Sequence, residues 1–475
     1  MSAGLTALIV WATLAFGAVY AWGYVPLLVG CATAGLLGVV RQRGVPPETR
    51  WPAGALLLLG VAGAAQLVPL PPEVVRRLDP ALAPLLDRYD VGYAISPAWH
   101  ALSVDPHSTE VSLAFLAAYS LFVAGLPALL SDVTVRRLAR NLVLFGVGLS
   151  LFGLLQKQTS NGLMYWFWQP REGSAGNAFG PFVDRDHFAG WMLLAIPVGI
   201  GLLTGEWVAH ARRPGSSLRN ALVWLSTPVG GRLTLLAVGL SVMTIAQVWT
   251  LSRSGIGCLL VAFGLFGWQG RRSAAIRRRG RGIVAYVVAV ALLALAWRGI
   301  GLVIAWYGDT RDLFGRFAAW GDGWHVIRSF PLFGTGLGTY SIAMLFYQRS
   351  NLPLLLRQAH NDYLQLAAEG GLLLVVPAAT AAGLAIREIR RRFREGNDDL
   401  LGYWLRVGCV IGLIVIAIQE TADFSLQMPA NAALFCIVLV IALRRPDAVV
   451  ARAEARGFRA RRSRISPARN ASQAG

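Results

Sequence analysis

The sequence has few charged residues for its length. Only 15% of its 475 residues are Asp, Glu, Lys or Arg, whereas a soluble domain carries about 25%. The hydrophobic share is 55% and the mean hydropathy is +0.53. Runs such as 56–68 and 283–297 contain almost nothing that favours contact with water. This shortage of charge argues against a soluble domain and indicates that lipid is the solvent.

Lysine is nearly absent, because Lys157 is the only one and arginine supplies the rest of a net charge of +19. Such a charge can indicate a nucleic-acid partner. Here most arginines stand in short segments between apolar runs, which is a pattern of membrane topology. We therefore expect membrane lipids as partners and no nucleic acid.

Cysteines are also scarce, and the four present are scattered. Cys31, Cys258, Cys409 and Cys436 lie in apolar runs, without a CxxC pair or a histidine at ligand spacing. They are expected to be small buried side chains rather than disulfides or metal ligands. The first apolar run lacks a preceding basic segment, so we expect an uncleaved first helix.

Long apolar runs are what the sequence does have. About twelve come near the roughly 20 residues that cross a bilayer, and each is expected to be a helix because backbone groups in lipid must bond internally. The predicted fold is an all-α polytopic membrane protein with about 12 transmembrane helices, a membrane domain over 1–444 and a basic disordered tail over 445–475. The expected spans are 5–21, 25–40, 52–70, 111–130, 139–157, 188–204, 232–249, 255–269, 282–305, 361–385, 403–419 and 429–444.

Arginine counts predict the orientation. One set of loops holds about 30 of the 44 basic residues, and the other set, although longer in total, holds about 11. Because cytoplasmic loops carry the excess of basic residues, both termini are expected in the cytoplasm. The arginine-rich set is 41–50, 131–140, 205–232, 270–281, 386–402 and the tail, and the other set is 71–110, 158–187, 250–254, 306–360 and 421–428.

The longest outer loop, 306–360, precedes the predicted tenth span and has a helical pattern of its own. Phe317, Trp320, Trp324 and Ile327 recur at helix spacing. This pattern predicts an amphipathic helix that lies against the outer membrane interface.

Charged residues gather at the start of one span, in Asp184, Arg185, Asp186 and His187. Ionisable groups beside hydrocarbon are costly and usually mark a functional cavity. The alternative is that the two aspartates pair with Arg185 as an interfacial anchor. The preceding aromatic run, 165–168, fits either a membrane belt or a platform on which sugars stack.

A second cluster is the short turn 250–255, Thr-Leu-Ser-Arg-Ser-Gly. Arg253 is a lone cation on the side that the arginine bias avoids. Guanidinium groups match phosphate oxygens in a bidentate way, so Arg185 and Arg253 together are candidates to clamp a diphosphate. The alternative is an arginine that extends to the interface from a helix end.

The glycine-rich segment 331–340 is a weak match to a dinucleotide fingerprint, because no βαβ pattern surrounds it. It is better interpreted as a tight turn in which glycines adopt positive φ. The next span begins with His360, Asn361 and Asp362, followed by further polar residues. A histidine has a pKa suited to proton transfer near neutral pH.

These motifs occur in the order found in the O-antigen ligase and polymerase superfamily, which the chain resembles over about 145–440. The resemblance is carried by Gly180-Pro181-Phe182, His187-Phe188-Ala189, 251–255, Arg316, Trp320, Pro331, Gly334, Gly336, Gly338, His360, Asn361 and Leu364. In the ligase motif of this family His360, Asn361 and Gly371 match, whereas Val375 departs from the last position. Ligase and polymerase therefore both stay open.

The resemblance implies a class C-type membrane glycosyltransferase of the bacterial inner membrane. Such enzymes move a glycan from undecaprenyl diphosphate to an acceptor hydroxyl, of a saccharide or of a lipid A-core, at the periplasmic face without metal or cofactor. The catalytic histidine of the family corresponds to His360 and its two outer arginines to Arg185 and Arg253. Asp184 and Asp186 stand where asparagine is usual, and the supporting residues are expected to be these two with His187, Arg316, Asn361 and Asp362.

The alternative from another functional class is a transporter or flippase of lipid-linked saccharides. A transporter is expected to have polar or broken helices at mid-membrane, often in paired halves. Here the polar clusters fall on one side, which favours an enzyme that works at one face.

The orientation is tested with reporter fusions at Arg445 and near Ser350. We expect a cytoplasmic signal at Arg445 and a periplasmic signal at Ser350, because of the arginine asymmetry. A cytoplasmic signal at Ser350 would contradict both the topology and the proposed active face.

Overall fold

The computed structural model describes residues 1–170, 177–210, 223, 226–272, 311–350 and 355–447. The predicted span 282–305, parts of the loops around 211–225 and 273–281, and most of the basic tail lie outside these residues. The described elements are α1 (Ser2–Leu14), η1 (Phe16–Ala18), α2 (Ala21–Gln42), α3 (Arg50–Ala65), α4 (Pro72–Leu78), α5 (Leu82–Tyr89), α6 (Val91–Ile95), α7 (Pro106–Gly125), η2 (Leu126–Leu129), α8 (Asp132–Gln158), α9 (Arg185–His210), α11 (Pro228–Trp249), α12 (Arg253–Arg272), α16 (Arg311–Ser329), α17 (Tyr340–Tyr347), α18 (Asp362–Glu395), α19 (Leu400–Gln419), η4 (Ser425–Gln427) and α20 (Pro429–Leu443).

Seven of the described helices are long and apolar enough to cross a membrane: α2, α7 with η2, α8, α9, α11, α18 and α19. The helices α1, α3 and α20 are apolar but shorter. An all-α polytopic membrane fold is therefore confirmed. The total of twelve spans stays a prediction.

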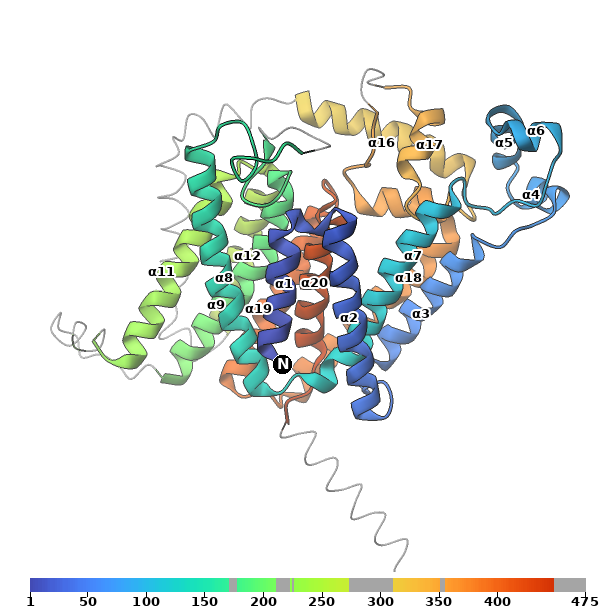
Figure 1. Ribbon diagram of the computed structural model, residues 1–475. Coiled ribbons are helices and arrows are strands. Elements are labelled where there is room, and N and C mark those ends of the chain that lie inside the picture. The colour runs from blue at the N-terminus through green and yellow to red at the C-terminus, as the bar shows by residue number, and fades with distance from the viewer. Residues whose placement is uncertain (171–176, 211–222, 224–225, 273–310, 351–354, 448–475) are drawn as a thin grey trace, which may run out of the picture.

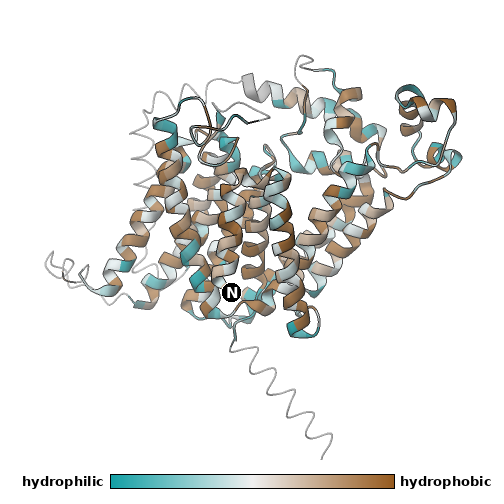
Figure 2. Cartoon of the chain, in the orientation of Figure 1, coloured by the Kyte–Doolittle hydropathy of each residue, from teal (hydrophilic) through white to brown (hydrophobic). Residues whose placement is uncertain are grey.

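The long helices run side by side in one bundle (Figure 1). Helix α9 lies at the core of the bundle, because its apolar stretch is entirely buried within the protein. Hydrophobic residues cover much of the bundle, whereas hydrophilic residues gather toward the helix ends and in α16 and α17 (Figure 2). Helices α16, α17 and α4 to α6 lie over one end of the bundle (Figure 1), which we call the site end.

Both ends of the described chain lie at the opposite end of the bundle. Asn141, in the first half of α8, donates a hydrogen bond to Thr6 of α1 over 3.1 Å. Arg444, which follows α20, forms an ion pair of 2.6 Å with Asp132 at the start of α8. The two ends are therefore on one side, as the sequence predicts, while the identity of that side stays a prediction.

The predicted C-terminal boundary of the first span, 5–21, is wrong. Helix α1 ends at Leu14, and Phe16, Gly17 and Ala18 adopt positive φ values of 59°, 71° and 60°. The rings of Tyr165 and Trp168 pack against Phe16, with centroids 5.2 and 5.3 Å away. The turn is made entirely of apolar residues, so it is fixed by packing and not by a polar break in the sequence.

The predicted span 52–70 also ends early, because α3 stops at Ala65. The next residue, Gln66, is buried, and its amide donates to the carbonyl of Phe333 over 2.6 Å and accepts from the backbone N–H of Leu337 over 3.1 Å. The glycine-rich segment 331–340, to which Gln66 bonds, turns tightly as predicted. Gly334, Gly336 and Gly338 have φ values of 68°, 107° and 78°.

Two further predictions are confirmed. The segment around Arg316 to Arg328 is helical, as α16, although its place at a membrane interface stays a prediction. All four cysteines are buried free thiols.

The crossing of α2 and α7 offers a test of the packing. A Cβ atom at Gly38 would lie 2.5 Å from the carbonyl carbon of Gly125, so Gly38→Val forces the helices apart. Overpacking of this kind costs about 1–3 kcal/mol, and we expect less folded protein in the membrane and a lower melting temperature in detergent. Gly60→Val in α3 is the matched control, because nothing lies within 4 Å of its Cβ position. Equal stability of both variants would contradict the packing.

Candidate active site

The charged cluster of 184–187 forms the start of α9. Asp184 caps this helix, because its carboxylate accepts from the backbone N–H of Asp186 over 2.8 Å and its carbonyl accepts from that of His187 over 3.2 Å. Arg185 is the first residue of α9 and is half-buried. The helix start therefore places a guanidinium at the positive end of the helix dipole.

Asp186 connects the start of α9 to other parts of the chain. Its carboxylate forms an ion pair of 3.5 Å with Arg316 of α16. Its carbonyl accepts from the amide of Gln419, at the end of α19, over 3.1 Å and from the hydroxyl of Ser425 over 3.2 Å. Asp186 thus joins distant segments at one point, which a purely local anchor would not require.

Arg253 stands at a second helix start, beside the first. Leu251 in the preceding turn has a positive φ of 55°, and the hydroxyl of Ser252 caps α12 by accepting from the backbone N–H of Gly255 over 3.1 Å. A Cβ atom at Gly255 would lie 2.6 Å from Cβ of Ala189, one turn into α9. Two adjacent helices therefore begin at the site end, each with a half-buried arginine as its first residue.

His360 lies two residues before α18 and has a positive φ of 49°. Asn361 is the N-cap, since its side-chain oxygen accepts from the backbone N–H of Leu364 over 3.0 Å. Asp362 accepts from the side-chain amide of Gln427 over 2.6 Å. A non-glycine residue in this backbone region costs free energy and is often found where a side chain is held for function.

Phe424 brings two histidines together. Its ring centroid lies 4.6 Å from that of His187 and 4.9 Å from that of His360, and both pairs meet edge to face. The two histidines come from α9 and from the segment before α18, which are far apart in the sequence. Phe424 was not predicted as a site residue from the sequence, because no neighbouring motif marks it.

Two carboxyl groups in the loop after α19 were also not predicted as site residues from the sequence. Glu420 and Asp423 are only 2% and 1% exposed. Burial raises the pKa of Glu420, and the charge of Asp362 raises it further. Burial likewise raises the pKa of Asp423, with added contributions from Asp186 and Asp184. The sequence signal that could have identified them is two ionisable residues three apart between apolar runs.

Three half-buried arginines, Arg185, Arg253 and Arg316, lie at the site. The raised pKa values of Glu420 and Asp423 make both carboxyl groups ionise less readily than they would in water. Fixed cations in a partly desolvated place stabilise an anion more strongly than they would in water. The arrangement suits a phosphate-bearing ligand with an imidazole nearby.

A cavity of about 480 Å³ opens beside this cluster, between α7, α18 and α20. Asp362, Gln365, Glu369 and Gln427 form its polar wall, and residues such as Phe115 form its apolar wall. The cavity has room for a ligand next to the first turn of α18.

Comparison with known protein families finds a match to one segment of the chain. Residues 238–379 match the family model described as O-antigen ligase, and this segment includes Arg253, Arg316 and His360 but not 184–187. A search of curated proteins found no match. Nothing in these comparisons supports the transporter alternative. The resemblance to the O-antigen ligase superfamily is therefore confirmed over residues 238–379, which are similar to the O-antigen ligase domain.

Proposed function

We propose that the protein transfers a glycan from an undecaprenyl-diphosphate-linked donor to an acceptor hydroxyl at the periplasmic face of the bacterial inner membrane. The acceptor is a saccharide or a lipid A-core, so the product is a ligated or a polymerised glycan. The observation that carries the proposal is that Arg185, Arg253 and His360 each stand at or just before the start of a helix at the site end. The starts of α9 and α12 are adjacent there, and Phe424 links His187 of α9 to His360. The O-antigen ligase domain supports the same class of reaction.

The two arginines at helix starts hold the diphosphate. A helix N-terminus favours an anion through its free N–H groups and its dipole, and Arg185 and Arg253 each add a guanidinium that bonds two oxygens at once. Arg316, fixed by its ion pair with Asp186, adds a third cation to the same region. As the sugar leaves the lipid, this preorganised charge stabilises the departing diphosphate.

His360 serves the acceptor. The acceptor oxygen forms a bond to the anomeric carbon while the bond from that carbon to the diphosphate oxygen breaks, and the electron pair leaves with the diphosphate. The proton of the acceptor hydroxyl goes to the imidazole of His360. The edge-to-face contact with Phe424 and the capped start of α18 support a fixed position for that ring. A single displacement of this kind inverts the anomeric configuration.

The cavity beside Asp362 is proposed to receive saccharide units. Its amide and carboxyl groups, from Gln365, Gln427 and Glu369, can exchange hydrogen bonds with sugar hydroxyls. The apolar wall from α7 and α20 suits the faces of sugar rings.

Replacement of either clamp arginine tests the donor site. Arg185→Ala and Arg253→Ala are expected to abolish glycan transfer while the protein still inserts, because the leaving diphosphate loses its counter-charge. Lysine at either position should rescue only partly, since a point charge lacks the bidentate fork. Transfer is measured with purified protein and lipid-linked donor, and Arg77→Ala in α4, an exposed arginine outside the cluster, is the control. Normal transfer by both alanine variants would contradict the clamp.

His360→Ala and His360→Asn test the proton acceptor. A general base contributes about 10²–10⁴-fold, so both variants should lose turnover by that factor with donor binding retained. Asparagine tolerates positive φ better than most residues, so His360→Asn separates the imidazole from the backbone strain. His107→Ala, at a histidine whose side chain is 84% exposed, is the control. Normal transfer at normal abundance would remove the catalytic role from His360.

Chelation tests the proposed independence from metal. In the described part of the chain no three His, Cys, Asp or Glu side chains are placed to hold a metal ion. We therefore expect transfer to continue in EDTA at an unchanged rate. Complete loss that Mg²⁺ or Mn²⁺ restores would point instead to a metal held by Asp184 and Asp186.

A further inference from the structure

A second cavity lies at the opposite end of the bundle from the candidate active site. Its volume is about 590 Å³, and it is enclosed by α8, α9 and α11. Glu206 on its wall is 21 residues along α9 from Arg185, which at 1.5 Å per residue places it roughly 30 Å away. The cavity is therefore separate from the site of glycan transfer.

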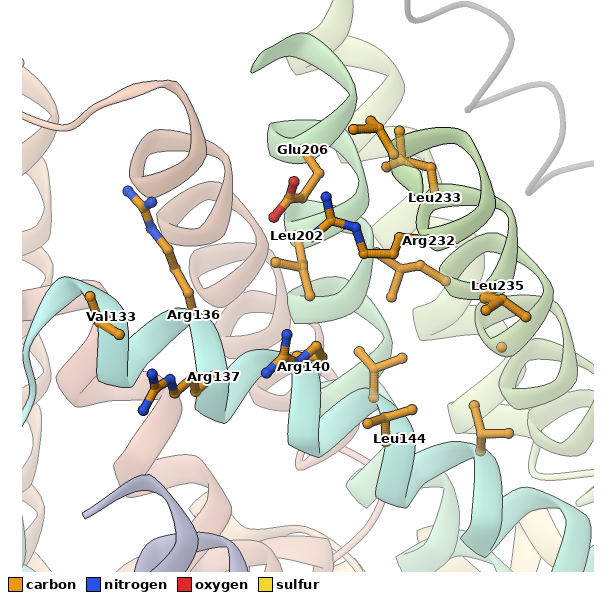
Figure 3. Close-up of a pocket in the computed structure, with 15 residues that line it drawn as sticks. Val133, Arg136, Arg137, Arg140, Leu144, Leu202, Glu206, Arg232, Leu233 and Leu235 are labelled. Carbon is orange, nitrogen blue, oxygen red and sulfur yellow. The ribbon is translucent and has the colours of Figure 1, made fainter. Parts of the chain in front are cut away.

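The mouth of this cavity is basic. Arg136, Arg137 and Arg140 contribute from successive turns of α8, and Arg232 contributes from α11. Figure 3 shows Arg140 and Arg232 extending from their two helices toward the space between them. Glu206 is the one acidic residue of the lining.

Most of this positive charge lacks a carboxylate partner among the described residues. Arg136 pairs with Asp399 at 2.5 Å, and Glu206 pairs with His210 at 3.2 Å. Within the described ranges, the other three arginines of the cavity form no ion pair. The mouth thus carries an excess of cations that are available to an anionic ligand.

The deeper wall of the cavity is apolar. Leu144 and Val147 lie one to three turns beyond the arginines of α8, and Leu236 lies one turn beyond Arg232 on α11. Leu202 lies one turn deeper than Glu206 on α9. The lining therefore changes from cationic to apolar along the bundle, toward the middle of the membrane.

We propose that this cavity binds an anionic glycerophospholipid from the leaflet at that end, which the arginine bias predicts to be cytoplasmic. The phosphate meets the guanidinium groups, and an acyl chain lies along the apolar wall. Basic pockets between membrane helices are known to suit such headgroups. A free phosphate would use the mouth alone, so the apolar wall favours a lipid. The proposal goes beyond glycan transfer and does not depend on it.

The test measures lipid affinity of the full-length protein by native mass spectrometry in detergent, with phosphatidylglycerol and phosphatidylcholine as probes. We expect tighter binding of phosphatidylglycerol. Arg137→Gln with Arg140→Gln should weaken it by about fivefold per arginine, since one cation near the surface has about that effect. Arg387→Gln with Arg390→Gln on α18 is the matched control, because these exposed arginines do not line the cavity. The affinity of this control for phosphatidylglycerol should stay within about twofold of that of the unsubstituted protein.

Leu236→Trp separates a lipid from a free anion. It fills the apolar wall and leaves the arginines in place, so phosphatidylglycerol should bind more weakly while the melting temperature without lipid is unchanged. If the double arginine variant does not fold, Arg232→Gln alone provides the charge test. The proposal is overturned by equal binding of both lipids, by equal loss in the control variant, by displacement of the lipid with glycerol phosphate, or by preferential binding of a polyprenyl phosphate.

Discussion

The close packing of α9 on α19 is the contact on which the rest of the protein depends. The Cα atom of Gly201 lies 3.2 Å from the position that a Cβ atom would take at Gly408, so side chains larger than hydrogen would separate the helices. Small residues at such crossings allow dispersion contacts and hydrogen bonds between membrane helices, where lipid supplies no hydrophobic driving force. The buried helix α9 is thus held at the centre of the bundle.

This packing also determines where the chemistry lies. The N-terminal end of α9 carries Arg185 and Asp186, and the C-terminal end of α19 leads directly into the loop with Glu420 and Asp423. A Cβ atom at Gly190 would lie 2.6 Å from Cβ of Ser425, so the loop rests on the first turns of α9. Because the two antiparallel helices are in contact along their length, charges at their ends are brought together.

The candidate active site and the basic cavity differ in how their charged side chains are partnered. At the site end, burial raises the pKa of Asp423 and Asp186 pairs with Arg316, so cations and carboxyl groups are interlocked in a partly buried place. At the opposite end, Arg137 and Arg140 are exposed at the mouth of a cavity. Charged groups held in place suit the stabilisation of a transition state, whereas exposed arginines suit the binding of lipid headgroups.

The sequence by itself determined the features that depend on local pattern. Apolar runs predict the membrane helices because backbone groups in lipid must bond within the segment. The cluster around Arg185, the helix start at Arg253 and the turn with Gly334 each follow from a few adjacent residues, and the structure has them at helix ends and in positive φ.

Only the tertiary structure decided the features that depend on distant contacts. The end of α1 at Leu14 is fixed by aromatic rings more than 150 residues away, and the end of α3 by the bonds of Gln66 to a distant loop. The pairing of His187 with His360 across Phe424, and the burial that keeps Asp423 from ionising readily, require helices that are not neighbours in the chain. A local sequence pattern does not specify which distant side chain packs against a given residue. The candidate site depends on such distant packing contacts.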